Sequence, residues 1–300
     1  MSRISLPDFA YPAHDFPIGK HVLRYVDTHP ETQNAAEVSG PTLVCVHGNP
    51  TWSYYYRRVI DAFAGRMRVI AVDNMGCGRS DKPNQQEFDY TLASHRDNLI
   101  ELLDRLELQR VILLVHDWGG AIGLSAGLAR LDQIAGLCVL NTGAFPPPYL
   151  PWRIAACRWP GLGPLAVRGL NAFALAALTM AVNRKPLTAQ TRRGLIAPYD
   201  SWKSRVAIDA FVKDIPMRPA HPTHATLLNL EKDLERFRET RVSIVWGMKD
   251  WCFRPECLDR FVAAWPHACV NRLDDCGHYV LEEAPDAVIE ALEHLQSRAS

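Results

Sequence analysis

Short runs of apolar and β-branched residues recur along this 300-residue chain, and longer amphipathic stretches separate them. This alternation is typical of β-α-β units, whose successive strands lie parallel in one sheet. The runs are apolar at almost every position, which indicates that helices cover both faces of the sheet. We therefore expect an α/β fold with a mostly parallel sheet. The predicted strands are Thr42–His47, Arg68–Asp73, Val111–His116, Gly136–Asn141, Arg241–Gly247 and Ala268–Leu273.

Helical spacing of apolar residues predicts helices over Leu92–Leu106, Gly119–Leu131 and Pro285–Leu295. The rhythm changes between residues 145 and 224, which contain 11 of the 21 prolines and no clear strand. We interpret 145–224 as a helical cap inserted between two strands. Residues 1–144 and 225–300 then form one core.

The charges balance, with 33 Lys and Arg against 33 Asp and Glu. A chain without net charge has no overall electrostatic attraction for nucleic acid or an anionic membrane, which argues against a phosphate-backbone binder. The N-terminus lacks the apolar stretch of a secretory signal. Gly169–Val182 is uncharged over only 14 residues, whereas a transmembrane helix needs about 20. The eight cysteines form no C-x-x-C pair, and most lie inside apolar runs, where a free thiol behaves as a small apolar side chain. This use of cysteine fits a reducing cytoplasm, which is the location we expect.

Asp117 ends a predicted strand, and Trp118-Gly119-Gly120 follows it. Glycines after a strand allow the sharp strand-to-helix turn that exposes a nucleophile. At the N-terminus of a helix the Asp117 carboxylate should be ionised. The sequence Gly123–Gly127 also matches the G-x-S-x-G pattern. It lies inside the predicted helix with no strand before it, so Ser125 is not expected to be a nucleophile.

Two further strand ends carry polar residues, Asp250 after Trp246-Gly247 and His278 after Cys276-Gly277. The chain order Asp117, Asp250, His278 is the order of nucleophile, acid and histidine in α/β-hydrolases. Asp250 is expected to hold one imidazole nitrogen of His278 and to leave the other facing Asp117.

The loop that contains Asn49 follows the first strongly apolar strand. A loop in this place donates a backbone N–H to an oxyanion, and Trp118, directly after the nucleophile, supplies a second. The Asn49 amide and the Trp118 indole are additional donors that can face a leaving anion.

Five motifs together resemble the haloalkane dehalogenase branch of the α/β-hydrolases: HGNPTW, DNMGCGRSDKP, HDWGG, WGMKD and DCGHYVLEEAP. The resemblance covers nearly the whole chain. It implies the α/β-hydrolase fold, an Asp nucleophile at Asp117, and a halide-binding pair at Asn49 and Trp118. The acid at Asp250 matches one subgroup of that branch.

Segments of the cap resemble the β-lactone decarboxylases of bacterial long-chain olefin biosynthesis, namely LNTGAFPPPYLPWR, VRGLNAFALAALTM, IAPYDSW and FVKDIPMRPAHPTH. Those enzymes convert cis-3,4-dialkyl β-lactones to cis-alkenes and carbon dioxide. The resemblance implies a long-chain apolar substrate and no cofactor or metal. It also implies neighbouring olefin-biosynthesis enzymes in a multienzyme assembly, with a place in the cytoplasm that includes the periphery of a membrane.

Attack of Asp117 on the alkyl carbon of the lactone would release a carboxylate, which Asn49 and Trp118 would stabilise. Loss of carbon dioxide would then expel Asp117 and form the double bond. Attack on the carbonyl carbon, which gives a mixed anhydride, is the other route, and the sequence does not choose between them. It also leaves open whether His278 acts as a base, an acid or an electrostatic partner.

The apolar cap residues suit a bulky ligand, and burial of each methylene contributes about 0.8 kcal/mol. The residues expected along a substrate channel are Trp152, Phe173, Leu175, Leu178 and Met180, each of which has packing within the cap as its alternative role.

Three alternatives to the lactone reaction remain at this stage. A haloalkane dehalogenase would use Asp117 and a water activated by His278. An ester or epoxide hydrolase is a further alternative, although esterases have Ser at the nucleophile position, and epoxide hydrolases use cap tyrosines, here Tyr149 and Tyr199. A non-catalytic α/β-hydrolase fold that serves as a binding protein is the last alternative.

Overall fold

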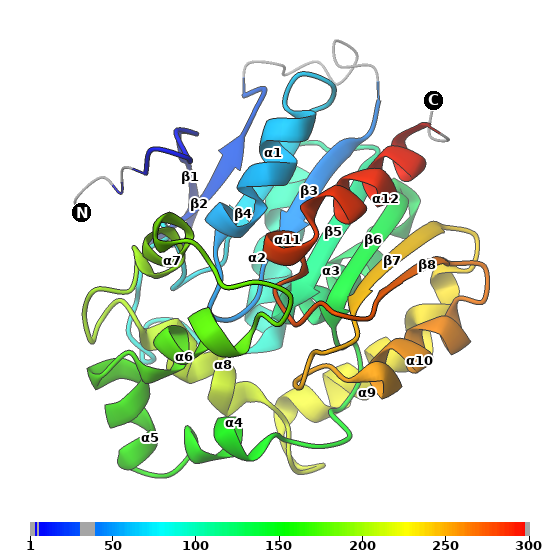
Figure 1. Cartoon of the computed structure of the whole chain (residues 1–300). Coiled ribbons are helices and arrows are strands. Elements are labelled where there is room, and N and C mark those ends of the chain that lie inside the picture. The colour runs from blue at the N-terminus through cyan, green and yellow to red at the C-terminus, as the bar shows by residue number, and fades with distance from the viewer. Residues whose placement is uncertain (1–3, 5, 31–39, 298–300) are drawn as a thin grey trace.

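A mixed sheet of eight strands runs through the computed structural model of the chain, which describes residues 4, 6–30 and 40–297 (Figure 1). The N-terminal stretch that lacks the apolar run of a secretory signal lies partly outside these residues. The strand order is β1-β2-β4-β3-β5-β6-β7-β8. The strands are β1 (His14–Ile18), β2 (His21–Asp27), β3 (Thr42–Val46), β4 (Val69–Asp73), β5 (Val111–Asp117), β6 (Ile134–Thr142), β7 (Arg241–Gly247) and β8 (Cys269–Leu273).

From β4 to β8 all neighbouring strands pair in parallel, whereas β1 pairs antiparallel with β2, and β2 with β4. All six predicted strands are present, with ends that differ by at most two residues from the prediction. The two strands β1 and β2 were not predicted. They lie at one edge and bury only part of their residues, so they lack the continuous apolar run that identifies a central parallel strand.

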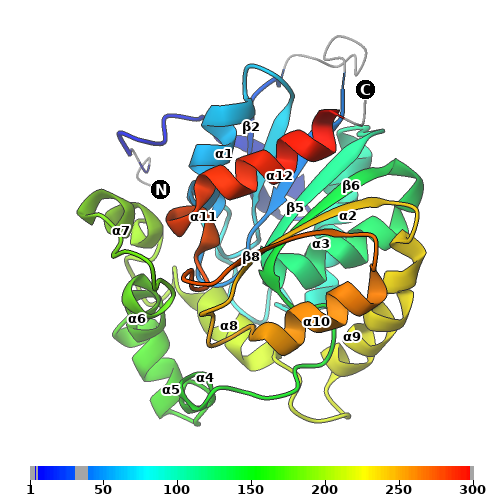
Figure 2. The same ribbon diagram turned by 45° about the vertical axis from the view of Figure 1, so that its right-hand side comes forward.

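Both faces of the sheet are covered, as the apolar runs predict (Figure 2). Along β3, Val44 and Val46 point to one core, and Leu43 and Cys45 point to the other. The first core contains buried residues of α2, α3, α9 and α10, and the second contains those of α1 and α12. The bounds are α1 (Arg57–Phe63), α2 (Leu92–Arg105), α3 (Trp118–Ala129), α9 (Pro222–Asp233), α10 (Pro255–Ala264), α11 (Val280–Glu283) and α12 (Pro285–Ser297).

The segment between β6 and β7 contains only helices and loops, and it lies at the carboxyl ends of the parallel strands (Figure 1). Its helices before α9 are α4 (Trp152–Ala156), α5 (Leu162–Pro164), the π-helical turn η3 (Leu165–Gly169), α6 (Ala172–Met180), α7 (Ala189–Ile196) and α8 (Val206–Asp214). The predicted boundary after residue 224 falls inside α9, which packs on the core helices α2 and α3.

Among the described residues, no single helix is long and apolar enough to cross a membrane. One pair, Leu162–Gly169 and Ala172–Met180, meets the length and composition requirement together, with a bend of 70° between its two halves.

Candidate active site

The carboxyl end of β5 carries Asp117, directly before α3. Its backbone is in an uncommon conformation, with φ 53° and ψ −130°. Few residues other than glycine adopt a positive φ, and backbone strain of this kind clusters at active sites. The turn therefore holds the Asp117 carboxylate out from the sheet, in the position that the sequence predicts for a nucleophile.

Close backbone approaches explain two glycines around this turn. A Cβ at Gly48 would lie 2.0 Å from Asp117 Oδ1 and 2.5 Å from the Trp118 nitrogen. A Cβ at Gly119 would lie 1.9 Å from the Val46 carbonyl oxygen. Only glycine fits at these distances, so the β3 loop can reach the Asp117 carboxylate. There the backbone N–H of Asn49 donates a hydrogen bond to Asp117 Oδ1 at 2.6 Å.

The strand ends bring Asp117, Asp250 and His278 together, although 133 and 161 residues separate the last two from Asp117 in the chain. The Nδ1 of His278 is 2.8 Å from Asp250 Oδ2. The Nε2 of His278 is 3.7 Å from Asp117 Oδ2. The imidazole thus bridges the two carboxylates in the order that the sequence predicts.

Burial and mutual charge set the protonation of this group. Burial raises the pKa of Asp117, while the nearby His278 and the backbone N–H groups of Asn49 and Trp118 act in the opposite direction. Burial also opposes a charge on His278, but the Asp250 carboxylate, its hydrogen bond and the Asp117 carboxylate together raise the pKa of His278. The net effect is that the pKa of Asp117 is raised above its ordinary value, with burial as the largest cause, and that the pKa of His278 is raised as well.

Several supporting residues were not predicted from the sequence. The amide of Asn141 donates a hydrogen bond to Asp250 Oδ2 at 3.0 Å. The ring of Phe253 stacks on His278, with 5.6 Å between ring centroids. The ring of His116 lies 4.4 Å from that of His278, and its Nε2 is 2.9 Å from the His278 carbonyl oxygen. Asn141 lies near the carboxyl end of a predicted strand, and this position is the one feature of the sequence that points to a place near the site.

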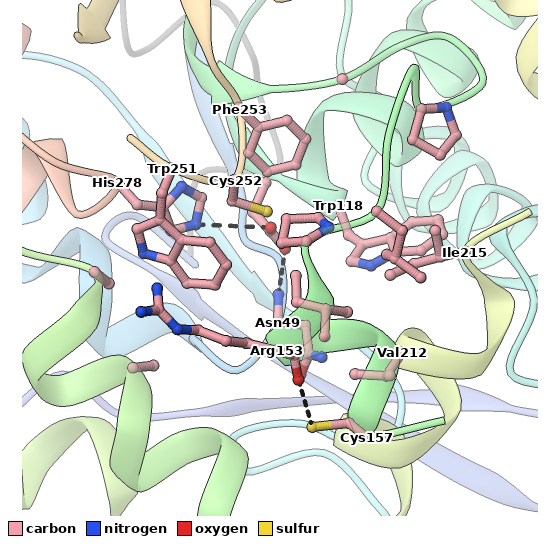
Figure 3. A pocket seen from close by; sticks show the side chains of 18 of the residues that line it. Asn49, Trp118, Arg153, Cys157, Val212, Ile215, Trp251, Cys252, Phe253 and His278 are labelled. Carbon is pink, nitrogen blue, oxygen red and sulfur yellow. Dashed lines mark hydrogen bonds and ion pairs between the residues drawn. The ribbon is translucent and has the colours of Figure 1, made fainter. Parts of the chain in front are cut away.

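Asn49 and Trp118 both line the cavity beside Asp117 (Figure 3). The Asn49 amide nitrogen donates one hydrogen bond to the Ile208 carbonyl at 3.2 Å, and its second hydrogen remains for a ligand. The Trp118 indole packs against Phe211, with 5.5 Å between ring centroids. Its N–H has no acceptor within the part of the chain that the structure describes. Both side chains can therefore donate to an anion held next to Asp117.

A cavity of about 480 Å³ lies between the sheet and the cap, with Asp117 and His278 in its wall. Figure 3 labels His278 among the residues that line it. Small-molecule sites typically have this size, with apolar walls and few polar groups. Most of the wall is apolar and comes from the cap, and the apolar residues include Phe145, Ile154, Phe173, Ala176, Ala177, Met180, Val212, Ile215, Leu227 and Phe253.

Three of the predicted channel residues, Trp152, Phe173 and Met180, line this cavity. Leu178 does not, so the prediction that it lines the channel is wrong. Phe173, Ala177 and Met180 follow the spacing of one helix face, whereas Leu178 lies on the opposite face of α6, buried in the core with Ala174. Leu175 is exposed to solvent and is also absent from the cavity wall.

The two cap tyrosines do not offer a free hydroxyl to the cavity. Tyr149 donates its hydroxyl to the Cys252 carbonyl at 2.5 Å, and Tyr199 donates to the Thr51 carbonyl at 3.2 Å. Ser125 lies within α3 and does not line the cavity. No three His, Cys, Asp or Glu side chains of the described residues are placed to hold a metal ion.

Residues 41–285 match the family model described as the α/β hydrolase fold. A cis-3-alkyl-4-alkyloxetan-2-one decarboxylase of Shewanella oneidensis is 39% identical over 87% of this chain and 83% of its own. A decarboxylase of the same name from Xanthomonas campestris is 38% identical over 90% of both chains. A crystal structure of a variant of the haloalkane dehalogenase DatA from Agrobacterium tumefaciens superimposes with a TM-score of 0.81, at 26% identity over 94% of this chain and 96% of that one. The chain therefore belongs to the α/β-hydrolase fold family, with oxetan-2-one decarboxylases and haloalkane dehalogenases among its relatives.

Proposed function

We propose that this chain is a carboxy-lyase that converts cis-3,4-dialkyl β-lactones (cis-3-alkyl-4-alkyloxetan-2-ones) to cis-alkenes and carbon dioxide, in long-chain olefin biosynthesis. One observation carries the proposal: the Asp117 carboxylate and its His278 partner lie in the wall of a largely apolar cavity. Two relatives that act on this lactone class share 38–39% of their residues with the chain.

In the first step an oxygen of Asp117 attacks C4 of the lactone, and the bond between C4 and the ring oxygen breaks. The electron pair of that bond stays on the ring oxygen, which becomes part of a carboxylate on C3. The product is an aspartyl ester at C4. The Asn49 amide and the Trp118 indole donate to the new carboxylate, as donors placed in advance for the charge that develops.

In the second step the bond between C3 and the carboxylate carbon breaks, and its electron pair forms the double bond. The bond between C4 and Asp117 breaks at the same time, which releases carbon dioxide and restores the Asp117 carboxylate. The imidazolium of His278 stabilises that carboxylate as it leaves. The two steps consume neither water nor a proton.

This route explains the cis product. Attack from the side opposite the ring oxygen inverts C4, so the aspartyl ester lies opposite the C3 carboxylate. Loss of two groups on opposite sides leaves the alkyl groups of a cis-lactone on the same side of the double bond. The cavity walls hold both chains during the reaction, and their methylenes supply the binding energy for this positioning.

Product analysis with a synthetic cis-dialkyl β-lactone tests the proposal. The wild type and the matched control Ser125→Ala should form the alkene, and Asp117→Ala should form none. A long-chain iodoalkane is tested in parallel. Halide and alcohol from the iodoalkane, without alkene from the lactone, would instead assign a haloalkane dehalogenase.

An alkene that persists in Asp117→Ala would exclude this mechanism. An intermediate quenched on the protein with acid distinguishes the two modes of attack, because mild alkali cleaves a mixed anhydride from attack on the carbonyl carbon at once and leaves an aspartyl ester in place. No alkene, no alcohol and no covalent adduct would leave only a binding protein. We further propose that the chain acts in the cytoplasm, in an assembly with the enzymes that supply its lactone.

A further inference from the structure

Large apolar side chains with about half or more of their surface exposed to solvent gather on the cap. Trp159, Leu162, Leu165, Leu170 and Trp202 have exposed fractions between 48% and 69%. We call these five residues the cap patch. Single exposed apolar residues are ordinary, but a group of this size that lies together marks an interaction surface.

Trp202 lies beside Leu165 although it is distant in the sequence. The other three residues of the patch, Trp159, Leu162 and Leu170, are within six residues of Leu165 in the chain. The Arg168 guanidinium lies 4.7 Å from the centre of the Trp202 ring. A Cβ at Gly169 would lie 3.2 Å from Leu165 and 3.7 Å from Trp202, so these two side chains flank the same glycine. The patch includes the turn between α4 and α5, α5 itself, η3 with the residue after it, and the loop before α8, at the end of the molecule opposite α1 (Figures 1 and 2).

The helices under the patch have one buried and one exposed face. Val167, Ala174 and Leu178 of η3 and α6 pack into the protein core. Leu162 and Leu165 face outward. The bent pair that meets the requirement for a membrane span is therefore fixed to the protein along one side, and only its other side is free to meet a lipid phase. This is the arrangement of a helix that lies in a membrane surface.

The charges of the chain are distributed unevenly, despite their overall balance. Residues 145–224 contain 11 Lys and Arg and three Asp and Glu, a net charge of +8, and the rest of the chain carries −8. Residues 145–199 contain seven Lys and Arg and no Asp or Glu. The whole-chain charge, which indicated no attraction to an anionic membrane, conceals a strongly basic cap.

Basic residues lie next to exposed tryptophans of the cap, two of them at Trp202 of the patch and one at Trp152 outside it. Arg153, Arg168 and Lys203 are adjacent to exposed tryptophans or contact them. No Asp or Glu of the described residues lies within 4.0 Å of their charged nitrogens. Unpaired basic side chains around tryptophan and leucine are the combination that binds anionic lipid headgroups and inserts apolar side chains beneath them.

We propose that the cap patch seats on an anionic phospholipid bilayer and that the cavity takes its lactone from that bilayer. Trp152 lines the cavity and is 74% exposed next to Arg153, and its helix α4 lies beside α5, which carries part of the patch (Figures 1 and 2). The choice of substrate rests on the proposed function, since a lactone with two long alkyl chains dissolves in lipid rather than in water. The patch and the charge do not depend on it.

Sedimentation with vesicles tests the proposal on the full chain. The wild type should bind vesicles of phosphatidylcholine and phosphatidylglycerol at least about tenfold more tightly than vesicles of phosphatidylcholine alone, and less tightly as salt rises. The double variant Leu162→Ser, Leu170→Ser should lose about tenfold or more in binding. Its matched control is Leu228→Ser, which changes an exposed leucine on α9.

The role of charge is tested with Lys203→Glu, which should weaken binding to the anionic vesicles about tenfold. Its matched control is Arg58→Glu on α1, which should change this binding little. Both residues are exposed. Turnover of a short, water-soluble lactone should stay unchanged in all these variants, which shows that they fold, and turnover of a vesicle-embedded long-chain lactone should fall with binding.

Equal binding to both vesicle types, or unchanged binding in the patch variants, would overturn the proposal. So would retention on an acidic polypeptide without vesicle binding, which would assign the patch to a protein partner. Vesicle binding without any alkene would leave the membrane surface intact and reject the lactone reaction, so the two failures are distinguishable.

Discussion

The side chain of Asn141 holds the Asp250 carboxylate from the neighbouring strand, with 3.0 Å between Asn141 Nδ2 and Asp250 Oδ2. The same amide also donates to the Gly247 carbonyl at 3.0 Å and accepts from the Gly247 N–H at 2.8 Å. All these groups are buried. Asn141 therefore fixes both the acid that orients His278 and the backbone that leads to this acid.

We predict that Asn141→Ala lowers kcat by about tenfold, because Asp250 loses a donor and Gly247 loses both partners. The buried unpaired groups should also lower the free energy of unfolding by about 1–3 kcal/mol. Steady-state kinetics with a soluble lactone and a denaturant titration measure the two effects. Asn141→Asp tests the positioning role, because a second carboxylate beside Asp250 should shift the pH profile. An unchanged kcat in Asn141→Ala would contradict the role.

The strand pattern was sufficient to place Asp117, Asp250 and His278 at one edge of the sheet. Each of the three lies at or after the carboxyl end of a predicted strand, and parallel strands gather their carboxyl ends in one place. Asn141 lies at such an end as well. It was not assigned because a single Asn has no distinctive spacing, and its role depends on a hydrogen bond across 109 residues.

The cap was the least predictable part of the chain. Phe173, Leu178 and Met180 all lie on α6, which is apolar on every side. Without polar residues to mark a solvent face, the sequence cannot tell the face that lines the cavity from the face that packs into the core. The two edge strands were missed for the opposite reason, since β1 contains polar residues and Pro17.

Stability should depend on pH through His278. Its pKa is raised in the folded state by Asp250 and Asp117, against the effect of burial. The contribution of His278 to the free energy of unfolding is therefore fully present below the pKa of about 6.5 that it has in the unfolded chain. This contribution is lost as the pH rises through the pKa of His278 in the folded protein. Asp250→Asn removes the main favourable partner, so its loss of unfolding free energy should be largest at acidic pH and smaller at alkaline pH. Chemical denaturation across this range measures it, and a loss that grows with pH would be inconsistent with a protonated His278.

His278→Ala should separate the lactone and halide reactions by mass spectrometry of the protein. An alkyl ester formed from an iodoalkane needs water for its removal, and without a neutral His278 to act as the base for that water it should accumulate on Asp117. An ester formed from the lactone carries its own carboxylate and resolves by loss of carbon dioxide. We expect slower alkene formation and no lasting adduct from the lactone. A stable lactone adduct would indicate that His278 is required to complete the reaction.

Gly48→Ala should strongly lower activity and should also destabilise the fold, because one of the new contacts is with backbone. The added Cβ would meet Asp117 Oδ1 at 2.0 Å and the Trp118 nitrogen at 2.5 Å, so the loop must move away from the nucleophile. We expect a loss of about 100-fold or more in kcat, as for removal of an oxyanion donor. Gly65→Ala is the matched control, because no atom lies within 4 Å of its Cβ position. Activity of Gly48→Ala near that of Gly65→Ala would show that the approach of this loop is not needed.

Ala177→Phe should change which lactones the protein accepts. Ala177 lines the cavity on the same helix face as Phe173 and Met180, and a phenyl group there occupies space meant for an alkyl chain. Each methylene that no longer fits loses about 0.8 kcal/mol of binding, or about fourfold in kcat/KM. Long-chain lactones should therefore lose far more than a diethyl lactone, when both are assayed as competing substrates. Leu175→Phe, on the exposed side of α6, should leave this ratio unchanged. Equal losses for both lactones in Ala177→Phe would mean that the alkyl chains lie elsewhere in the cavity.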